Sequence, residues 1–538
     1  MKKHIEPRRY LLHFSSHELP QRFADVLVIG SGVAGLSAAI AAARHADVLL
    51  VSKDELRESN TQYAQGGVAA VWAEADSFAA HVADTLTVGQ GLCDAAVVES
   101  IVRDGPARLR DLIAAGARFD RDGAAYNLTR EGGHSHARIL HAQGDATGAE
   151  IERTLLLQAA ASPRLRSLDH TYVVDLLTDA GECVGALLSS QTQGLTIVWA
   201  KHTILASGGL GQLYRETTNP EVATGDGIAM AYRAGAVLQD MEFVQFHPTT
   251  LYIAGASRCL VSETLRGEGA RLLNSRGERF MPRYHPDAEL APRDVVSRAI
   301  LAEMRATGAT HVRLDLRHFD AARARERFPS IARVCEQFDL NLAEDLIPVR
   351  PSAHYMIGGV RVGADARTSL PRLWACGECA SSGLHGANRL GSNSLLEGLV
   401  LGHRAGDDAG RRAAAQAGDL APRAIRAEAR SPHEDRLDLR DVANSLKSLM
   451  WRHAGIERCE DLLREAEESI DFWCRYVMDK EFHFRSGWEV QNMLTLAKII
   501  TVAARARTES RGVHYRSDYP QTDDAQWKKH TTFQRPPE

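Results

Sequence analysis

The sequence lacks an excess of charge of either sign. Its 538 residues include 64 Lys and Arg against 69 Asp and Glu, which gives a formal net charge of -5. Proteins that bind nucleic acid or an anionic membrane usually carry an excess or a block of basic residues, because phosphates attract positive charge. We therefore expect neither nucleic acid nor a membrane as a partner, whereas a small anionic substrate held by a few local cations remains open.

Cysteine is also scarce, with eight residues scattered over the chain. A secreted disulfide scaffold would concentrate its cysteines in a short chain, so this usage predicts a reducing, cytoplasmic location. The first residues include no apolar run or cleavage site of the kind found in signal peptides. Cys376 and Cys379 have CxxC spacing, and His134, His136 and His141 lie close together. The cysteine spacing would suit a metal or a redox dithiol, but no second pair exists at ligand spacing, so we favour neither; we also expect no zinc at the histidines.

Long apolar runs are almost absent, and the one exception is Val26 to Ala43, VLVIGSGVAGLSAAIAAA. This run approaches the length of a membrane span. Its three glycines, however, fall where a strand would turn tightly into a helix, so we interpret it as soluble structure. The flanking elements support this: a β-branched strand at 25–29, a helix at 36–43 and a second apolar strand at 47–52 form a βαβ unit.

The glycines of this unit, Gly30, Gly32 and Gly35, suggest a dinucleotide site. Without side chains, the turn can bring backbone N–H groups and a helix N-terminus up to a pyrophosphate. The acidic ribose partner expected after the second strand is not clear, because that strand ends in Ser52 and Lys53. A glycine turn without a ligand remains the alternative.

The rest of the chain predicts a sheet interrupted by an insertion. Apolar strands at 201–206 and 372–375 both end in glycine-containing segments, and the βα alternation fades between them. After Gly402 an Ala/Arg/Asp-rich stretch ending near His433 predicts a linker, three helices follow at 437–453, 456–478 and 488–507, and the tail after Pro520 is predicted to be disordered. The predicted units are an N-terminal extension (1–24), a dinucleotide-binding domain (25–239 and 357–422), a capping domain (240–356) and a C-terminal helical domain (423–538).

Two later segments favour FAD over NAD. The runs TILASGG (203–209) and LWACGEC (373–379) resemble the second and third segments that complete an FAD site in flavoproteins with two dinucleotide-binding folds. In these proteins an acidic residue, here Glu378, meets the ribityl or ribose hydroxyls. The segment GSNSLL (391–396) offers Ser392, Asn393 and Ser394 at a helix start, whose positive end could face an anionic flavin.

Eight ordered strings carry a more specific resemblance. They are ESNTQYAQGGVAA (58–70), LTREGGHSHARILHAQGDATG (128–148), FHPT (246–249), SETLRGEGA (262–270), APRDVVSRAI (291–300), AHYMIGGV (353–360), GLHGANRLGSNSLLE (383–397) and ESRGVHYRSDYP (509–520). Together they resemble the succinate dehydrogenase/fumarate reductase flavoprotein family, and within it the branch that oxidises L-aspartate. The match is collinear from about residue 25 to 520.

Two positions distinguish the branches of this family. Respiratory members carry a histidine that attaches FAD covalently, and the corresponding residue here is Asn60, whose amide cannot form that bond. Bound FAD is therefore expected to be non-covalent. Glu131 resembles the glutamate that orients the amino group of aspartate in the oxidases; a carboxylate there would pair with an ammonium, which succinate lacks.

The resemblance also implies the remaining site residues. Arg389, His247, His354 and Ser262 would hold the two carboxylates of the substrate, for which the planar fork of an arginine is well suited. Arg293 resembles the family's proton donor and acceptor, and Glu263 and Arg266 occupy relay positions. The implied FAD contacts are Gly30, Ser31, Gly32, Val33, Ala34, Gly35, Lys53, Asn60, Thr61, Gln62, Tyr63, Ala64, Gln65, Gly66, Gly67, Asp226, Glu378, Ser394 and Leu395.

The implied fold is an α/β, Rossmann-like FAD-binding domain interrupted by an α+β capping domain and followed by a C-terminal helical bundle, with the cap closing over the substrate. The implied reaction oxidises L-aspartate to iminoaspartate, the first step of de novo NAD biosynthesis through quinolinate. Electrons would pass to O2, giving hydrogen peroxide, or to fumarate, and quinolinate synthase would receive the product. Two alternatives stay open: a fumarate reductase or succinate dehydrogenase flavoprotein subunit with an iron-sulfur partner, and a non-catalytic flavin-binding scaffold.

Overall fold

A twisted sheet forms the centre of the first domain in the computed structural model, which describes residues 8–253, 259–416, 418, 420–428 and 437–536. Its strands run in the order β10-β11-β12-β2-β3-β9, and β19 also pairs with β12. The parallel strands are β2 (Gln21–Ile29), β3 (Val48–Val51), β9 (Leu165–Leu168), β12 (Gly194–Leu205) and β19 (Leu373–Ala375). The antiparallel strands β10 (Thr171–Asp179) and β11 (Glu182–Ser190) extend one edge.

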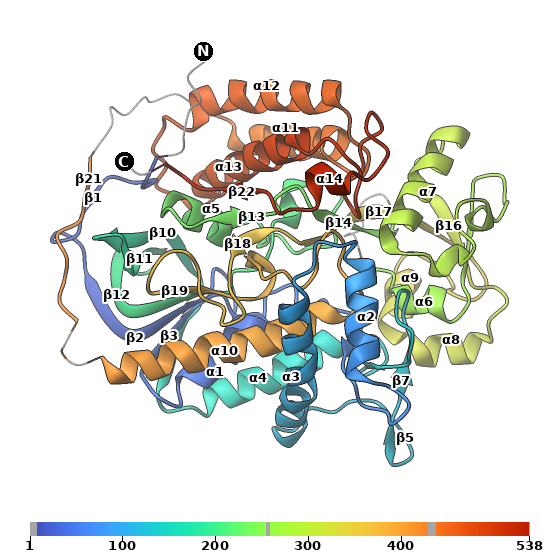
Figure 1. Ribbon diagram of the computed structural model, residues 1–538, viewed down its shortest axis with the longest axis horizontal. Helices are drawn as coiled ribbons and strands as arrows, with labels where there is room; N and C mark the ends of the chain where they lie inside the picture. Colours follow the sequence, from blue (N-terminus) through green and yellow to red (C-terminus); the bar gives the residue numbers. More distant parts are fainter. Residues whose placement is uncertain (1–7, 254–258, 417, 419, 429–436, 537–538) are drawn as a thin grey trace.

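Both faces of this sheet are buried, which explains the continuous apolar strands in the sequence. On β2, Val26 and Val28 pack with helices on one face, whereas Leu27 and Ile29 belong to the core that includes the C-terminal helices. The helices of the first face, seen below the sheet in Figure 1, are α1 (Val33–Ala42), α3 (Ala95–Ala114), α4 (Thr147–Ala160) and α10 (Asn393–Ala415).

Small residues bring α1 and α10 into close contact. A side chain added at Gly402 would place Cβ 2.4 Å from the Ala34 carbonyl oxygen, and one at Gly406 would place it 2.0 Å from the Ala38 carbonyl oxygen. The linker predicted after Gly402 is therefore wrong in its first part: residues 403–415 continue α10, because this glycine ridge packs on the alanines of α1. The predicted end of the linker near residue 433 lies outside the described residues.

The capping region lies to the right in Figure 1 and has its own apolar core. An antiparallel sheet runs in the order β14-β17-β16-β15, and β14 and β17 are the strands by which the chain enters and leaves it. Its strands are β14 (Val244–Leu251), β15 (Arg271–Leu273), β16 (Val312–Asp315) and β17 (Leu346–Met356). Its helices are α6 (Glu263–Gly267), α7 (Arg293–Thr307), α8 (Ala321–Arg327) and α9 (Pro329–Glu336).

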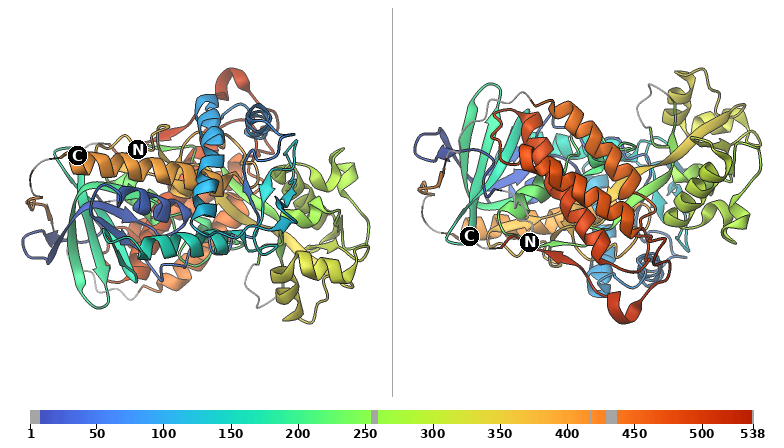
Figure 2. Two further views of the ribbon diagram at one scale, coloured as in Figure 1. Left: turned by 90° about the horizontal axis from the view of Figure 1, so that it is seen from below. Right: turned by 90° about the horizontal axis from the view of Figure 1, so that it is seen from above.

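Three C-terminal helices share the core on the other face of the main sheet, where α13 packs on α5 (Asp226–Arg233), and they cross the molecule in the right-hand view of Figure 2. They are α11 (Leu439–His453), α12 (Glu460–Val477) and α13 (Arg485–Ala506). This arrangement confirms the predicted fold class, whereas the four domain limits stay predictions. In the part of the chain that the structure describes, no helix is long and apolar enough to cross a bilayer.

The prediction of a disordered tail after Pro520 is wrong. Residues 521–536 include α14 (Asp524–Trp527) and β22 (Thr532–Phe533), which pairs with β13 (Leu238–Gln239). The fully buried Arg507 holds this tail by donating to the carbonyl oxygens of Trp527 (2.9 Å) and Lys529 (2.8 Å). Strand pairing, the buried cation of Arg507 and the packing of Phe533 against the main core therefore order this tail although its sequence is mostly polar.

Short elements complete the fold. The remaining helix is α2 (Phe78–Val88). The remaining strands are β1 (Phe14–Ser15) with β21 (Arg426–Ala427), β4 (Val68–Ala69) with β8 (Ile139–Leu140) and β7 (Leu128–Thr129), β5 (Arg121–Asp122) with β6 (Ala125–Tyr126), and β18 (Gly359–Arg361) with β20 (Ala380–Ser381).

Candidate active site

A long cavity of about 1730 Å³, counting the part open to solvent, runs from the glycine turn after β2 to the capping region. The main sheet, the segment 58–67, the start of α10 and the cap all contribute to its walls. Residues far apart in the chain therefore meet in one space, which has a long arm suited to a dinucleotide and a charged end beneath the cap.

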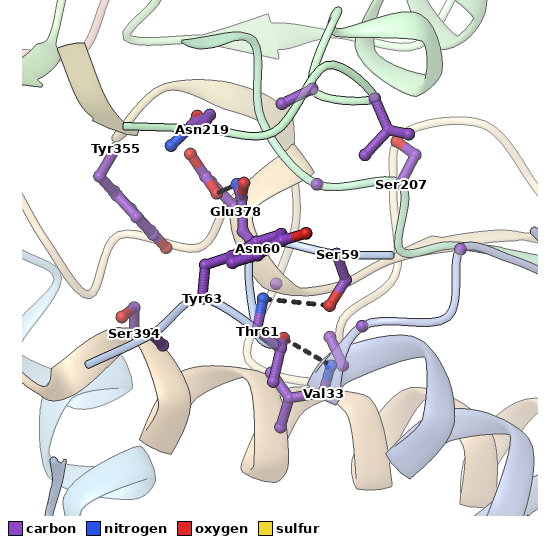
Figure 3. Close-up of a pocket in the computed structure, with 18 of the residues that line it drawn as sticks. Val33, Ser59, Asn60, Thr61, Tyr63, Ser207, Asn219, Tyr355, Glu378 and Ser394 are labelled. Carbon is purple, nitrogen blue, oxygen red and sulfur yellow. Dashed lines mark hydrogen bonds between the residues drawn. The ribbon is translucent and has the colours of Figure 1, made fainter. Parts of the chain in front are cut away.

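The glycine turn is built for close backbone contact. Gly30 has φ +110°, and a Cβ there would lie 2.1 Å from the Ala206 carbonyl oxygen, so only glycine fits. Gly32 is different, because its Cβ would come no closer than 3.2 Å, to Thr61 Oγ1. The Thr61 hydroxyl accepts a hydrogen bond from the N–H of Val33 (3.0 Å), which fixes the start of α1 (Figure 3). Gly32 thus faces the cavity, whereas Gly35 packs against the Gly30 carbonyl oxygen.

The segment from Ser59 to Gly67 forms a second wall, and its polar atoms test whether FAD fits. Asn60 donates through Nδ2 to Glu378 Oε2 (2.8 Å), and Figure 3 shows the two side chains side by side. The carbonyl oxygens of Asn60 and Gln65, Oδ1 and Oε1, are buried without a partner among the described residues. Burial raises the pKa of Glu378 to about 7, although the N–H of Met356 and the Asn60 amide oppose the shift. These buried acceptors and the glycine cradle suit the hydroxyls, ring N–H groups and phosphates of FAD.

Lys53 and Asp226 lie together at the far end of the cavity. Lys53 Nζ donates to Asp226 Oδ2 (2.7 Å), Thr224 Oγ1 (2.7 Å) and Glu489 Oε1 (2.8 Å). Lys53 and nearby donors hold the pKa of Asp226 below its usual value despite burial, which alone would raise it. Asp226 on α5 thus places an acidic side chain beside Lys53 at the end of the second strand, and Lys53 also contacts Glu489 on α13.

Most residues predicted to bind FAD line this cavity, and two do not. Gly35 and Gln62 lie outside the lining. Those that line it are Gly30, Ser31, Gly32, Val33, Ala34, Lys53, Asn60, Thr61, Tyr63, Ala64, Gln65, Gly66, Gly67, Asp226, Glu378, Ser394 and Leu395. Their contacts with FAD stay predictions.

At the charged end, cap residues meet residues of the first domain. Arg293, the first residue of α7, donates through Nε to Glu263 Oε2 (2.5 Å), and Arg266 lies 3.7 Å from the other oxygen of that carboxylate. Burial would raise the pKa of Glu263, but the two arginines outweigh it and hold the pKa low. Arg266 is buried behind this pair and does not line the cavity. The three side chains form a charged chain that begins at the cavity with Arg293 and Glu263 and ends inside the cap with Arg266.

Glu131 is a second carboxylate at this end. Ser392 Oγ donates to Glu131 Oε2 (2.7 Å), and only 3% of Glu131 is exposed. Burial and the negative charge of Glu263 raise the pKa of Glu131, whereas Arg293 lowers it. A Cβ added at Gly391 would lie 2.7 Å from Glu131 Oε2 and 3.1 Å from Arg293 NH2, which shows how closely the two side chains approach. A positive group bound here would relieve the repulsion between the two carboxylates.

Gln245 joins two arginines of the site and was missed by the sequence reasoning. Its Oε1 accepts from Arg293 NH1 (3.3 Å) and Arg389 Nε (3.1 Å), and its Nε2 donates to the Arg389 carbonyl oxygen (2.8 Å). Arg389 also donates to Ser394 Oγ (2.9 Å) and lies 4.4 Å from the centre of the Tyr355 ring. Gln245 precedes His247 by two residues on β14, so strand alternation was a usable signal.

Two histidines face the same space, with ring centres 5.2 Å apart. Burial and the nearby arginines lower the pKa of both His247 and His354 well below the usual value, so both are neutral. Thr218 Oγ1 lies 2.9 Å from His354 Nδ1, and donation by this hydroxyl leaves Nε2–H free to donate. His247 Nδ1 lies between the carbonyl oxygen (3.0 Å) and the N–H (3.3 Å) of Thr249. Ser262, which caps α6, completes this wall.

The described residues include no group of three or more His, Cys, Asp or Glu side chains placed to hold a metal ion. His134 Nε2 instead contacts the Gly391 carbonyl oxygen (3.0 Å), and Arg138 NH1 lies 3.1 Å from His134 Nδ1. Cys376 and Cys379 are buried, and burial raises the pKa of both thiols. The redox dithiol considered for this pair would need thiols that ionise more readily.

Comparison with known proteins agrees with this geometry. Residues 25–395 match the family model described as an FAD binding domain, and residues 443–538 match the fumarate reductase flavoprotein C-terminal model. The chain is 43% identical to the L-aspartate oxidase of Streptomyces coelicolor, over 96% of this chain and 92% of that protein. It is 42% identical to L-aspartate oxidase 1 of Ralstonia nicotianae, over 93% and 96% of the two chains.

Solved structures show the same fold. FrdA of E. coli quinol fumarate reductase superimposes with a TM-score of 0.88 at 32% identity, covering 96% of each chain. Sdh1 of Mycobacterium smegmatis superimposes with a TM-score of 0.82 at 34% identity, covering 95% of this chain and 91% of that one. With two family models and full-length relatives in agreement, the chain belongs to the L-aspartate oxidase family, within the succinate dehydrogenase and fumarate reductase group of FAD-binding flavoproteins.

Proposed function

We propose that this protein oxidises L-aspartate to iminoaspartate with FAD, as the first step of NAD biosynthesis. One observation carries the proposal beyond family membership: the buried carboxylate of Glu131 lies in the same cavity as Arg389, Arg293 and two neutral histidines. Aspartate carries two carboxylates and one ammonium. This cavity offers hydrogen-bond donors for the carboxylates and an acceptor for the ammonium.

The carboxylates of the substrate are held by groups that the protein has already oriented. Gln245 and Ser394 fix the guanidinium of Arg389, which therefore presents a planar fork without further ordering. His354 adds Nε2–H, because Thr218 occupies its other nitrogen. For His247, a bound carboxylate favours the tautomer in which Nδ1 accepts from the N–H of Thr249 and Nε2 donates.

Glu131 selects the amino group. Its position between Ser392 and the Arg293–Glu263 pair orients one carboxylate oxygen and leaves the other for an ammonium. When it is bound, FAD supplies the acceptor for the hydride that leaves the substrate Cα. Loss of the hydride from Cα and of one proton from the ammonium together give the protonated imine. We assign the transfer of that proton to Arg293, since Glu263 at 2.5 Å and Arg266 behind it can carry the proton onward.

The electron acceptors and the destination of the product belong to the same proposal. Electrons pass to O2, giving hydrogen peroxide, or to fumarate, which the dicarboxylate site accepts because it has the same two carboxylates. Iminoaspartate is unstable, and quinolinate synthase is the proposed recipient. The scattered cysteines support a reducing, cytoplasmic location, whereas the related proteins of tobacco and rice are described as chloroplastic.

Anaerobic mixing tests this function. FAD-loaded protein is mixed with L-aspartate and, separately, with succinate, while the absorbance of oxidised flavin is followed. We expect L-aspartate to bleach the flavin and air or fumarate to restore it. Bleaching by succinate alone would contradict the proposal and favour a succinate dehydrogenase flavoprotein. Yellow colour released on denaturation would support non-covalent FAD, in accord with Asn60.

A further inference from the structure

Helix α9 of the cap is capped by a side chain from the other domain. Both oxygens of Asp145 accept hydrogen bonds from this helix, Oδ1 from the N–H of Ser330 (3.1 Å) and Oδ2 from the N–H of Ile331 (3.1 Å). The first N–H groups of a helix lack partners within it and are usually satisfied by the residue before the helix. That residue here is Phe328, which has no side-chain acceptor. Asp145 therefore acts as the N-terminal cap of α9, although it belongs to the other domain.

The loop that carries Asp145 is fixed to the wall of the cofactor cavity. Asp120 accepts from the N–H groups of Gln143 (2.8 Å) and Gly144 (2.9 Å) just before it. Three residues beyond Asp145, the N–H of Gly148 donates to the carbonyl oxygen of Ala64 (3.0 Å), and Ala64 lines the cavity. The carboxylate is thus presented from a rigid support that belongs to the flavin side.

The opposite flank of the cap has a different connection. Arg298, on the same helix as Arg293, donates to the carbonyl oxygen of Gly512 (3.2 Å) and lies 5.2 Å from the centre of the Tyr515 ring. Strands β14 and β17 enter and leave the cap on the first domain. Helix α9 therefore meets the flavin domain through Asp145, and beside it Arg327 NH1 donates to the Gly144 carbonyl oxygen (3.2 Å).

Burial makes this contact sensitive to separation of the two domains. Only 3% of Asp145 is exposed, and burial raises the pKa of its carboxyl while the α9 amides lower it. A charged carboxylate at a helix N-terminus is stabilised by the unpaired N–H groups and by the helix dipole. If the cap moved away, the carboxylate and the amides would both turn to water, so the contact stabilises only the closed arrangement.

We infer that Asp145 is a positioning residue that latches the cap in its closed state, and so holds Glu263 and Arg293 over the bound dicarboxylate. The inference rests on the proposed dicarboxylate site beneath the cap. Release of a ligand from that site requires the latch to open, so the latch sets the dissociation rate more than the association rate.

Displacement of malonate from the FAD-loaded protein tests the latch. Malonate is a three-carbon dicarboxylate that lacks C–H bonds on two adjacent carbons and has no amino group, so it cannot be oxidised at this site. Its release is followed by stopped-flow flavin absorbance. The variant Asp145→Asn keeps the side-chain volume but loses the charge and one acceptor. We expect its dissociation rate to rise about tenfold, with an association rate within about threefold of the wild type. An unchanged dissociation rate in this variant would overturn the latch.

A matched control and a second measurement separate the latch from loss of stability and from the function itself. Glu336→Gln makes the same chemical change at the other end of α9, where Glu336 pairs with Arg325 within the cap (3.0 Å), and should leave malonate release unchanged. Hydrogen exchange of the backbone amides of α6 needs no ligand, and Asp145→Asn should speed it several-fold. If wild-type protein fails to bind malonate, the proposed function fails, and α6 exchange alone decides the latch: equal exchange in the variant and wild type overturns it.

Discussion

The substitution Glu131→Gln should weaken aspartate oxidation far more than fumarate reduction. Glu131 is 3% exposed and would meet the substrate ammonium in a site that excludes water. Removing one partner of a buried, hydrogen-bonded charge pair costs about 2–5 kcal/mol, and about 1.36 kcal/mol corresponds to a factor of ten. Repulsion between Glu131 and Glu263 in the free protein offsets part of this cost, since the substitution relieves it. We therefore expect kcat/KM for L-aspartate to fall about 30- to 300-fold.

Fumarate supplies the comparison, because it has two carboxylates and no ammonium. With a reduced dye as electron donor, kcat/KM for fumarate should stay within about threefold of the wild type. Steady-state rates of both reactions on the same preparation give the ratio directly. Ser392→Ala is the matched control: it keeps the Glu131 carboxylate but removes its 2.7 Å hydrogen bond, and should lower aspartate oxidation less than tenfold. An equal fall in both reactions for Glu131→Gln would refute recognition of the amino group.

Three further predictions concern folding and cofactor binding. Gly32→Ala should fold but bind FAD at least tenfold more weakly in a fluorescence titration, because its Cβ would lie 3.2 Å from Thr61 Oγ1 and push on the cavity wall that Thr61 and Ser59 form; unchanged affinity would contradict the cradle. Burial raises the pKa of Glu152 to about 8. Between the ordinary pKa of a glutamate and pH 8, the folded state therefore holds a proton that the unfolded state has lost. The free energy of unfolding falls as pH rises through that window. Glu152→Gln should flatten the decline of Tm with pH there, and a parallel decline would show that another group causes it. Truncation after Pro520 removes two carbonyl acceptors from the buried Arg507 and should lower Tm by several degrees; an unchanged Tm would mean that the tail does not stabilise the fold.

Local sequence patterns predicted the helices, strands and turns that depend mainly on neighbouring residues. The run from Val26 to Ala43 predicts strand, glycine turn and helix, and the structure has β2, the turn at Gly30 and α1 there. The C-terminal helices were found for the same reason, since apolar periodicity follows the buried face of α11 and α12, whereas α13 carries apolar residues along its length and is buried on nearly all sides. The prediction of a linker failed at α10, where glycines that usually interrupt helices instead let Gly402 and Gly406 pack on α1.

The charged site depends on contacts that no local pattern contains. Glu131, Glu263, Arg293 and Arg389 meet only because the cap is inserted between parts of the first domain, and their grouping was predicted from family resemblance alone. Gln245 was missed, because an amide on a strand has many possible partners and its role appears only when two arginines reach it. The tail was missed for a similar reason: nothing in its polar sequence reveals a buried cation elsewhere.

The pairing of β22 with β13 also bears on how the protein is made. Strand β13 immediately precedes the cap, whereas its partner β22 is made only after the cap and the three C-terminal helices. Domains generally fold from the N-terminus during synthesis. A nascent chain can therefore assemble the main sheet and the cap while the edge of β13 is still without this partner. The pairing with β22 thus makes this edge one of the last parts of the described structure to be completed.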